Sequence, residues 1–339
     1  DLSNYLKRIP SSAGNQKTWT WSSWVKRSTL SGSQRDIAAA ALSSNYLRIA
    51  GFTSGDNLEV CRADSAVIKL ETNQLFRDTS AWYHIVVAFD TTNGTTADRI
   101  KLYVNGTRVT SLSTASYPSI NTEWAVNAAY EMRIGAFKDK TSATVYSPFD
   151  GHLNSLYLID GQALGPENFG FTDPLTNTWR PKKYNHRTDL YGVTWSSALV
   201  GDASGFPSPA TAASGFNGEV GTDDGDYAQN STGTNPSTIT FTPVGGIKFN
   251  SSIQVYLINA ANTVNVNGEG AQSIAANEWV TVKTGSGTLN TLVFSRPSTN
   301  GASFGGIRID GHILIDAQND NSFYLPMDGN SPIGQDKSG

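Results

Sequence analysis

The sequence predicts an all-β protein made of two antiparallel β-sandwich domains in tandem. Apolar and polar residues alternate with a period of two in many short runs, and Asn-Gly or Asp-Gly turns separate several of these runs. Only 16% of the residues are charged while glycine occurs 32 times, which favours strands joined by polar turns over helices. Hydrophobic residues make up 38% of the 339 residues, enough for packed cores.

The first half of the chain contains the clearest strand patterns. Residues 82–90 (WYHIVVAFD) form an apolar run rich in β-branched and aromatic residues, as in a central strand. Residues 99–106 alternate cleanly, and their Asn105-Gly106 end supplies the positive φ of a type I′ hairpin turn. Two further strands are expected at 130–137 and 153–160.

Residues 18–27 (TWTWSSWVKR) predict another strand with a defined inner face. Trp19 and Trp21 share one face and Trp24 falls on the other, because residues two apart on a strand point the same way. His84, inside the apolar run at 82–90, is expected to be a hydrogen-bonded structural residue rather than a base.

A polar, basic and Pro-containing stretch at 176–190 marks the boundary between the two domains. We therefore predict a first domain at residues 1–182 and a second at 183–316. Residues 317–339 are expected to be a linker or the start of a further unit. The strands expected in the second domain have short alternating patterns at 237–243, 252–258, 263–270, 278–284, 289–296 and 307–316.

Composition excludes several classes of partner. The net charge of −4 and the missing basic field argue against a nucleic-acid partner. No apolar run approaches the length of a membrane span, so membrane insertion is not expected. The single cysteine, Cys61, excludes intrachain disulfides and multi-cysteine zinc sites, and is expected to be a small core residue.

The sequence also predicts that the protein is not an enzyme. Retaining glycosidases need two carboxyl groups about 5 Å apart, which an E-x-D-x-E strand pattern provides. That pattern is missing, and Glu59, Glu71, Glu123, Glu131 and Glu167 stand alone in the sequence. Neither a G-x-S-x-G elbow nor a phosphate-binding P-loop occurs.

Aromatic residues outside the clearest strands are the candidates for sugar binding. Trp124 lies in a polar stretch, and Trp179 lies in the stretch between the domains. Aromatic rings can pack against sugar faces, while neighbouring polar groups bind hydroxyls. Trp124 and Tyr146 are our candidate carbohydrate-binding residues, with core packing as the alternative interpretation.

The segments TWTWSSWVKR, W-Y-H-x5-D, x-L-Y-V-N-G and FDGHLNSLYLIDGQAL resemble, in this order, the laminin-G-like and concanavalin-A-like jelly-roll modules of phage tail fibres and virion appendages, those of marine cyanophages especially. The resemblance covers roughly residues 1–184. It implies a jelly-roll fold for the first domain, and such modules often carry a calcium ion at their rim.

The second domain resembles galactose-binding-like modules in one segment, ATAASGFNGEVGTDD at 210–224. The family's calcium site would fall on Asn217, Glu219, Asp223 and Asp224, although Asn217 replaces the usual aspartate. Calcium is therefore the one cofactor that the sequence offers, and solvated turn residues are the alternative interpretation of this acidic loop.

Together these features predict a non-enzymatic structural and adhesion protein of a virion. It would be a fragment of a phage tail fibre or capsid appendage, assembled in the host cytoplasm, that binds a host-surface glycan and other virion proteins, with a homo-oligomer, such as a trimer, as a further option. The fragment expectation comes from the start at Asp1, the end in PIGQDKSG and the missing signal peptide. A secreted pair of bacterial carbohydrate-binding modules and a passive virion spacer remain alternatives.

Overall fold

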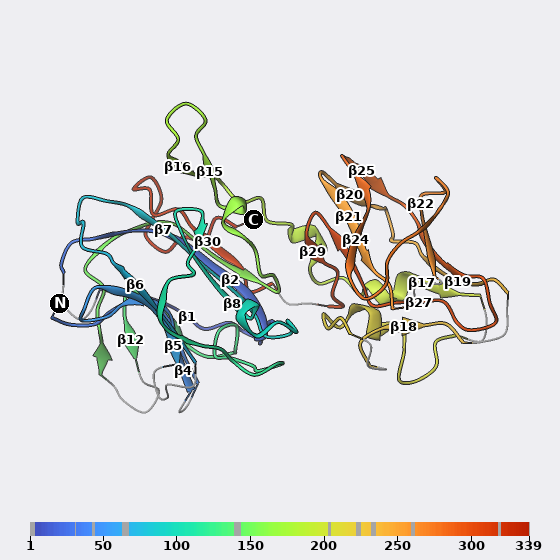
Figure 1. Cartoon of the computed structure of the whole chain (residues 1–339), viewed down its shortest axis with the longest axis horizontal. Helices are drawn as coiled ribbons and strands as arrows, with labels where there is room; N and C mark the ends of the chain where they lie inside the picture. Colours follow the sequence, from blue (N-terminus) through green and yellow to red (C-terminus); the bar gives the residue numbers. More distant parts are fainter. Residues whose placement is uncertain are drawn as a thin grey trace. The chain divides into compact units, whose positions relative to one another are not determined.

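The computed structural model describes residues 4–30, 32–42, 45–62, 68–138, 144–202, 205–221, 225–231, 235–258, 262–317 and 320–338. The chain forms two compact units, one of residues 1–186 with 319–339 and the other of residues 187–318. Within the described ranges the strands pair antiparallel and the helices are short 3₁₀ turns. The predicted all-β fold class is therefore confirmed (Figure 1).

Unit 1 is a sandwich of two large sheets. The seven-stranded sheet runs in the order β1 (Leu6–Arg8), β11 (Met132–Ile134), β3 (Arg35–Leu42), β4 (Asn45–Phe52), β5 (Asn57–Arg62), β6 (Lys69–Leu75) and β10 (Leu112–Ser116). The six-stranded sheet runs in the order β30 (Phe323–Leu325), β14 (Gly151–Asp160), β2 (Thr18–Arg27), β7 (Tyr83–Asp90), β8 (Ile100–Val104) and β9 (Thr107–Arg108).

The core of unit 1 lies between these sheets, where the inner faces of both meet. Trp19 and Trp21 on β2 are fully buried there, and Trp19 stacks on Phe89 at 4.6 Å between ring centroids. Trp24 points to the opposite face and stacks on His84 at 5.1 Å. The predicted facing of these three tryptophans is thus confirmed, because the strand keeps a regular period of two.

Smaller elements complete unit 1. They are the hairpin β12 (Phe137–Lys138) with β13 (Val145–Tyr146), the hairpin β15 (Gly170–Thr172) with β16 (Trp179–Pro181), and the 3₁₀ turns η1 (Thr96–Asp98) and η2 (Pro166–Asn168). The β15–β16 hairpin and its loop extend away from the body of the sandwich (Figure 1).

The C-terminal segment differs from the expectation of a linker or a further unit at 317–339. Strand β30 pairs with β14, and Phe323 and Leu325 enter the core of unit 1 at 4% and 6% exposure. The physical reason is an open edge: β14 needs a second neighbour for its backbone groups, and the apolar run FYL supplies both the ladder and apolar side chains.

Unit 2 is a second sandwich with its own core. Its larger sheet contains β17 (Leu199–Gly201), β19 (Ser237–Phe241), β26 (Leu292–Arg296), β22 (Thr263–Val266) and β23 (Ala271–Ser273). The facing sheet contains β24 (Trp279–Thr284), β21 (Ser252–Tyr256), β28 (Gly306–Ile309) and β29 (His312–Ile313). Phe216, Phe241, Phe294 and Phe304 are fully buried in this core.

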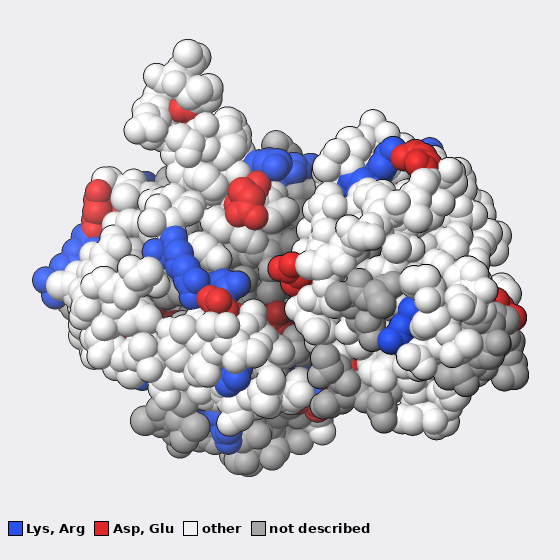
Figure 2. Space-filling view, turned by 45° about the vertical axis from the view of Figure 1, so that its right-hand side comes forward, with Lys and Arg blue, Asp and Glu red and all other residues white. Residues whose placement is uncertain are grey.

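The remaining elements of unit 2 are short. They are the strand pairs β18 (Ala228–Gln229) with β27 (Ser303–Phe304) and β20 (Ile247–Phe249) with β25 (Gly287–Leu289), and the 3₁₀ turns η3 (Thr188–Leu190), η4 (Trp195–Ala198) and η5 (Ala213–Phe216). Among the described residues, the helical segments are all too short and too polar to cross a membrane. Charged side chains lie scattered among uncharged ones on the face shown in Figure 2.

Candidate functional site

Polar and charged side chains form a row across the outer face of the seven-stranded sheet. On β5 the side chains of Leu58 and Val60 enter the core, so Glu59 and Cys61 face outward. The register continues this row through directly opposed residues, namely Arg133, Ala39, Arg48, Cys61, Lys69 and Ser116. A second row places Glu59 opposite Glu71.

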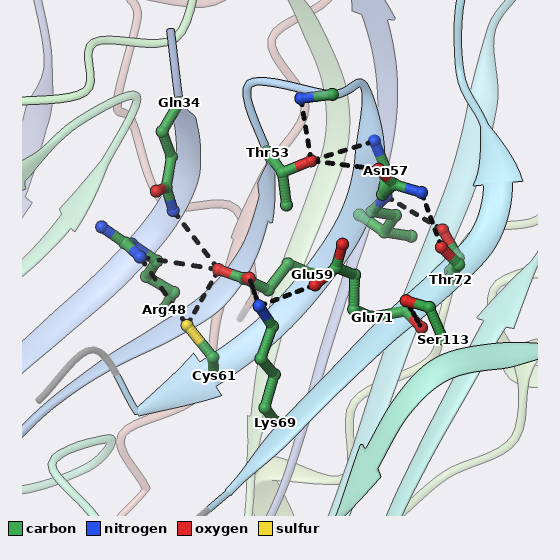
Figure 3. A network of polar contacts seen from close by, with 12 residues as sticks. Gln34, Arg48, Thr53, Asn57, Glu59, Cys61, Lys69, Glu71, Thr72 and Ser113 are labelled. Atoms are coloured by element: carbon green, nitrogen blue, oxygen red, sulfur yellow. Dashed lines mark hydrogen bonds and ion pairs between the residues drawn. The ribbon is translucent and has the colours of Figure 1, made fainter. Parts of the chain in front are cut away.

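We call the connected polar groups on this face the sheet-face network. It consists of Gln34, Asp36, Arg48, Glu59, Cys61, Lys69 and Glu71. Glu59 lies at its centre: Oε1 accepts hydrogen bonds from the Cys61 thiol at 2.9 Å and from Gln34 Nε2 at 3.4 Å (Figure 3). Its other oxygen, Oε2, lies 2.9 Å from Lys69 Nζ. Glu59 therefore uses both oxygens to hold its neighbours in place.

Arg48 anchors the inner end of the network. Its Nε lies 3.0 Å from Asp36 Oδ1, and its Nη1 lies 3.5 Å from Glu59 Oε1. The guanidinium also stands over the Phe137 ring, 5.8 Å from its centroid. With this side chain only 17% exposed, Arg48 is a positioning group rather than an open cation.

Lys69 and Glu71 form the open end of the network. Lys69 Nζ bridges the two carboxylates, at 2.6 Å from Glu71 Oε2 as well as 2.9 Å from Glu59 Oε2. The two side chains are 30% and 20% exposed, compared with 5% for Glu59. Next to them Ser113 and Asn73 are exposed, and the Ser113 hydroxyl donates to the Glu71 carbonyl at 3.3 Å. A ligand from solvent would meet this end first.

Burial and pairing set the protonation states within the network. Burial alone would raise the pKa of Glu59, but the Cys61 thiol, Lys69 and Arg48 together outweigh it and lower that pKa. Burial raises the pKa of Asp36 to about 6, against the opposing effect of Arg48. Hydrogen bonds to Glu71 and Glu59 raise the pKa of Lys69 despite its partial burial. These shifts favour the ionised forms of Glu59 and Lys69, which form an ion pair.

Cys61 belongs to this network and not to the hydrophobic core. It is 5% exposed, and its thiol is a donor to Glu59. Burial and the neighbouring Glu59 carboxylate raise the pKa of the thiol to about 12. The thiol thus remains protonated and serves as a hydrogen-bond donor. The expected burial of Cys61 is confirmed, but the thiol lies on the outer face of the sheet beside Glu59 and not in the cluster between the two sheets.

Tyr146 lies at the edge of the same face. It is 43% exposed on β13, directly opposite Phe137 on β12, with ring centroids 6.2 Å apart. Phe137 in turn lies under the Arg48 guanidinium. The hairpin thereby links an exposed aromatic ring, through Phe137, to the Arg48 end of the sheet-face network. Its role in sugar binding stays a prediction.

Trp124 does not have the exposure that its polar neighbours suggested. It is 6% exposed and packs against Phe89 in the core of unit 1, with ring centroids 4.7 Å apart. The flanking Asn121 and Glu123 are exposed while the tryptophan turns inward. The expectation of an accessible ring was wrong because a loop can place one side chain in the core and keep its neighbours in water.

Trp179 packs against His84 on the outer face of the six-stranded sheet. Its Nε1 donates to His84 Nδ1 at 2.9 Å, and the two rings stack with centroids 6.0 Å apart. His84 Nε2 lies 2.9 Å from Ser22 Oγ. An indole nitrogen is only a donor, so Nδ1 is unprotonated and Nε2 carries the proton. His84 is therefore a hydrogen-bonded structural residue, as expected.

The calcium prediction falls largely on residues that the structure does not describe. Asp223 and Asp224 lie outside the described residues. The Asn217 amide closes its own loop, because Nδ2 donates to the Gly225 carbonyl at 2.7 Å and Oδ1 accepts from Glu219 N at 2.9 Å. Within the described ranges no group of three acidic, His or Cys side chains could hold a metal ion. Calcium binding stays a prediction.

The opposed pair Glu59 and Glu71 does resemble a catalytic carboxylate pair in one respect. Both carboxylates contact the same ammonium, which brings them near the separation of about 5 Å used by retaining glycosidases. However, Lys69 Nζ fills the space between them, where a scissile bond would have to lie. The lowered pKa of Glu59 excludes it as a general acid but would suit a nucleophile, so it is the position of Lys69 that disfavours hydrolysis. The arrangement favours binding over hydrolysis.

Unit 2 has one open pocket of note among its described residues, with a volume of about 210 Å³. It lies between η4 and the turn at 243–247, and its lining includes Val193, Trp195, Pro243 and Val244. This lining is mainly apolar, and its one carboxylate, Asp189, is held by Arg187 at 2.8 Å. The pocket offers far fewer polar groups for a sugar than the sheet-face network.

The sequence predicts the polar outer face of these strands, but residue spacing does not predict which side chains meet on it. In residues 57–62 and 68–72 charged residues alternate with apolar ones, which indicates two strands with polar outer faces. Glu59 and Glu71 stand alone in the sequence but face each other across neighbouring strands. Alternation predicts the face, whereas the partner depends on register.

Comparison with known proteins locates a family match in the first half of the chain. Residues 3–167 match the family model described as concanavalin A-like lectin/glucanases superfamily. No significant match is found among curated protein sequences. Residues 3–167 include the whole sheet-face network and Tyr146.

Solved structures with some likeness to this chain include three animal, protozoan and bacterial proteins. A native heptameric SAP-like pentraxin from Limulus polyphemus is 17% identical, over 47% of this chain and 70% of its own, with a TM-score of 0.32. A Trypanosoma rangeli sialidase in complex with sialic acid is 11% identical, over 45% and 22%, with a TM-score of 0.33. The Ruminococcus gnavus IT-sialidase CBM40 is 14% identical, over 48% and 95%, with a TM-score of 0.34.

Proposed function

We propose that this chain is a glycan-binding protein without catalytic activity, and that unit 1 binds the glycan on the outer face of its seven-stranded sheet. The observation that carries the proposal is the sheet-face network, whose donors and acceptors hold one another in a fixed array beside the exposed ring of Tyr146. The match to the lectin and glucanase family over residues 3–167 supports it.

The geometry suits hydroxyl groups. A sugar hydroxyl both donates and accepts hydrogen bonds, and the open end offers carboxylate acceptors next to an ammonium donor. Because these groups are held by ion pairs and by the strands beneath them, little side-chain entropy is lost when a ligand binds. Tyr146 supplies an apolar ring face at the edge of the array.

The biological setting we propose is a virion. The chain would be part of a phage tail fibre or capsid appendage that attaches the particle to a host-surface glycan. The order of strand motifs in the first domain motivates this proposal. A single domain would bind weakly, and several copies on one particle would supply useful strength through avidity.

The first test measures glycan binding by the whole protein on an array of immobilised bacterial oligosaccharides and polysaccharides. We expect Tyr146→Ala and Glu71→Ala to reduce binding about tenfold or more, as for contacts at the centre of an interface. Phe171→Ala is the matched control for the tyrosine, since Phe171 is 47% exposed on β15, in the hairpin that extends from the sandwich (Figure 1). Unchanged glycan binding in both Tyr146→Ala and Glu71→Ala would refute this site.

The second test separates attachment from a purely structural role. Labelled protein in oligomeric form is incubated with bacteria that carry or lack surface polysaccharide, and phage adsorption is measured after preincubation. Attachment predicts polysaccharide-dependent labelling and reduced adsorption. Unchanged adsorption together with no labelling would indicate a passive spacer.

Glycoside hydrolysis is the second candidate, favoured by the facing of Glu59 and Glu71. It predicts release of reducing ends from a glycan that the protein binds, and loss of this release in Glu71→Gln. We expect no such release because Lys69 occupies the space between the carboxylates.

A further inference from the structure

The cations of the sheet-face network are already paired with carboxylates of the same face. Lys69 contacts both Glu59 and Glu71, and Arg48 contacts Asp36 and Glu59. Arg133, in the same row, pairs with Glu131 and lies over the Tyr5 ring at 4.2 Å. An acidic ligand would therefore find these three cations already paired, while the exposed Lys7, opposite Arg133 on β1, lies outside the network.

The exposed carboxylate at the open end also disfavours an acidic ligand. Lys69 and Glu71 are the two most exposed charged groups of the network, and Glu59 lies directly behind them. The network has two cations, Arg48 and Lys69, and three carboxylates, those of Asp36, Glu59 and Glu71, so its carboxylates outnumber its cations. A ligand carboxylate or sulfate would have to displace Glu71 from Lys69 or remain beside it as a like charge.

Neutral hydroxyl groups meet no such obstacle. An ammonium has three N–H donors and Lys69 directs its ion pairs to two carboxylates, while a carboxylate has more acceptor sites than the one that Glu71 uses toward Lys69. A hydroxyl can accept from the former and donate to the latter without breaking an ion pair. The neighbouring Ser113 side chain adds a hydroxyl, a neutral group that can also form hydrogen bonds with a sugar.

Building on the function proposed above, we propose that the sheet-face network selects neutral glycans over acidic ones, and that Glu71 sets this selectivity. The carboxylate of Glu71 acts in two ways: it accepts from sugar hydroxyls, and it shields Lys69 from ligand anions. Removing its charge should leave Lys69 paired with Glu59 alone and available to a ligand anion.

The test compares matched neutral and acidic probes on the whole protein. Immobilised lactose and 3′-sialyllactose, and neutral hexose oligosaccharides with and without a terminal hexuronate, are titrated against wild type and Glu71→Gln. Wild type should prefer the neutral member of a pair by about tenfold, as expected for one like-charge contact near the surface. In Glu71→Gln the ratio of the affinity for the neutral probe to that for the acidic probe should fall several-fold or invert.

Asp98→Asn is the matched control. Asp98 pairs with Arg108 at 2.7 Å near β9, and its substitution changes the net charge by the same amount away from the network. It should leave the ratio unchanged. Thermal melts of each variant report whether the fold is retained.

Salt supplies a second measurement that needs no variant. Binding of the neutral probe by wild type should change little between about 0.05 and 0.5 M NaCl, because screening acts on charge–charge contacts. Binding of the acidic probe by Glu71→Gln should weaken over the same range.

The outcomes distinguish this inference from the function on which it rests. Tighter binding of the acidic probe by wild type, lost in Glu71→Ala, would overturn the selectivity and leave the glycan site standing. A ratio that Asp98→Asn changes as much as Glu71→Gln would also overturn it, since net charge alone would then explain it. Failure to bind either class of probe would refute the proposed function itself.

Discussion

At the scale of single residues, two buried polar groups of unit 1 are held by several partners each. His84 is 1% exposed, yet each ring nitrogen has a partner, Trp179 on one side and Ser22 on the other. Asp160 is fully buried and joins three separate segments through its carboxylate. Such groups stabilise one arrangement of the chain because a lost partner leaves a buried polar atom unsatisfied.

The environment of His84 predicts a neutral ring over the physiological pH range. Burial lowers its pKa to about 3, so between roughly pH 6.5 and 3 the folded protein binds fewer protons than the unfolded chain. Stability should therefore fall as the pH falls through this window. Long-range ¹H–¹⁵N spectra of the imidazoles should show an Nε2–H tautomer for His84 from pH 8 to about 4.5. A midpoint near pH 6, assigned with His84→Gln, would contradict this.

Asp160 predicts a large effect for a small change. Its Oδ1 accepts from Asn15 N at 2.8 Å and from Asn127 Nδ2 at 2.9 Å, and its Oδ2 accepts from Asn321 N at 3.2 Å. In Asp160→Asn one acceptor becomes a donor that faces another donor. We expect a loss of about 1–3 kcal/mol in the free energy of unfolding, measured by denaturant titration. Asp328→Asn, on the exposed C-terminal turn, is the control and should change stability little.

At the scale of secondary-structure elements, the strands that could be predicted are those with regular alternation. The runs at 82–90, 99–106 and 153–160 become β7, β8 and β14. The apolar run FYL at 323–325 indicates a short strand, but the sheet that it joins could not be predicted, because three residues carry too little periodicity to identify a partner. Its place depends on the open edge of β14, which only the assembled sheet presents.

The candidate site likewise contains residues that the sequence could indicate and residues that it could not. Tyr146 was accessible to sequence reasoning because it lies outside the strong strand patterns and is exposed. Arg48, Cys61 and Lys69 were not, because they come together only through the register of three neighbouring strands. Local sequence predicts which face a side chain takes, and long-range pairing determines what it meets there.

Strand β30, which is distant in sequence from the other strands of its sheet, predicts an effect on the stability of unit 1. Phe323 and Leu325 are buried in the core of unit 1, and Tyr324 stacks on Tyr157 with centroids 4.3 Å apart. Burial of these side chains contributes about 1.5–3 kcal/mol each. Phe323→Ala should therefore lower the melting temperature of unit 1 by several degrees in a calorimetric scan. Ile333→Ala is the control on the same segment, since Ile333 is 81% exposed.

At the scale of the whole molecule, the described residues form one main hydrophobic core in each unit. The main core of unit 1 lies between the sheets of residues 1–186 and 319–339, and that of unit 2 lies within residues 187–318. Unit 1 has a smaller buried cluster besides, which includes Tyr157 and Phe169. Each main core contains fully buried aromatic residues of its own, Phe89 in unit 1 and Phe216 in unit 2. Since each unit buries its own apolar surface, each has the means to fold as a cooperative unit.

Two cores predict two separable unfolding transitions. Phe216 is fully buried against Phe241 and Phe304, with ring centroids 5.6 Å apart in both pairs. Truncation to alanine leaves a cavity and should cost about 3–5 kcal/mol. In differential scanning calorimetry Phe216→Ala should lower one transition, while Phe89→Ala, its counterpart in unit 1, should lower the other.

The same experiment locates the glycan site without any binding-site variant. A ligand that binds only the folded form of one unit raises the transition of that unit. A bound neutral oligosaccharide should therefore raise the transition that Phe89→Ala lowers, because the sheet-face network lies in unit 1, and should leave the transition that Phe216→Ala lowers unchanged. If the oligosaccharide shifts only the transition that Phe216→Ala lowers, the glycan site lies in unit 2. The pocket beside Trp195 would then be the first candidate. One transition lowered by both variants would instead show that the two cores unfold together.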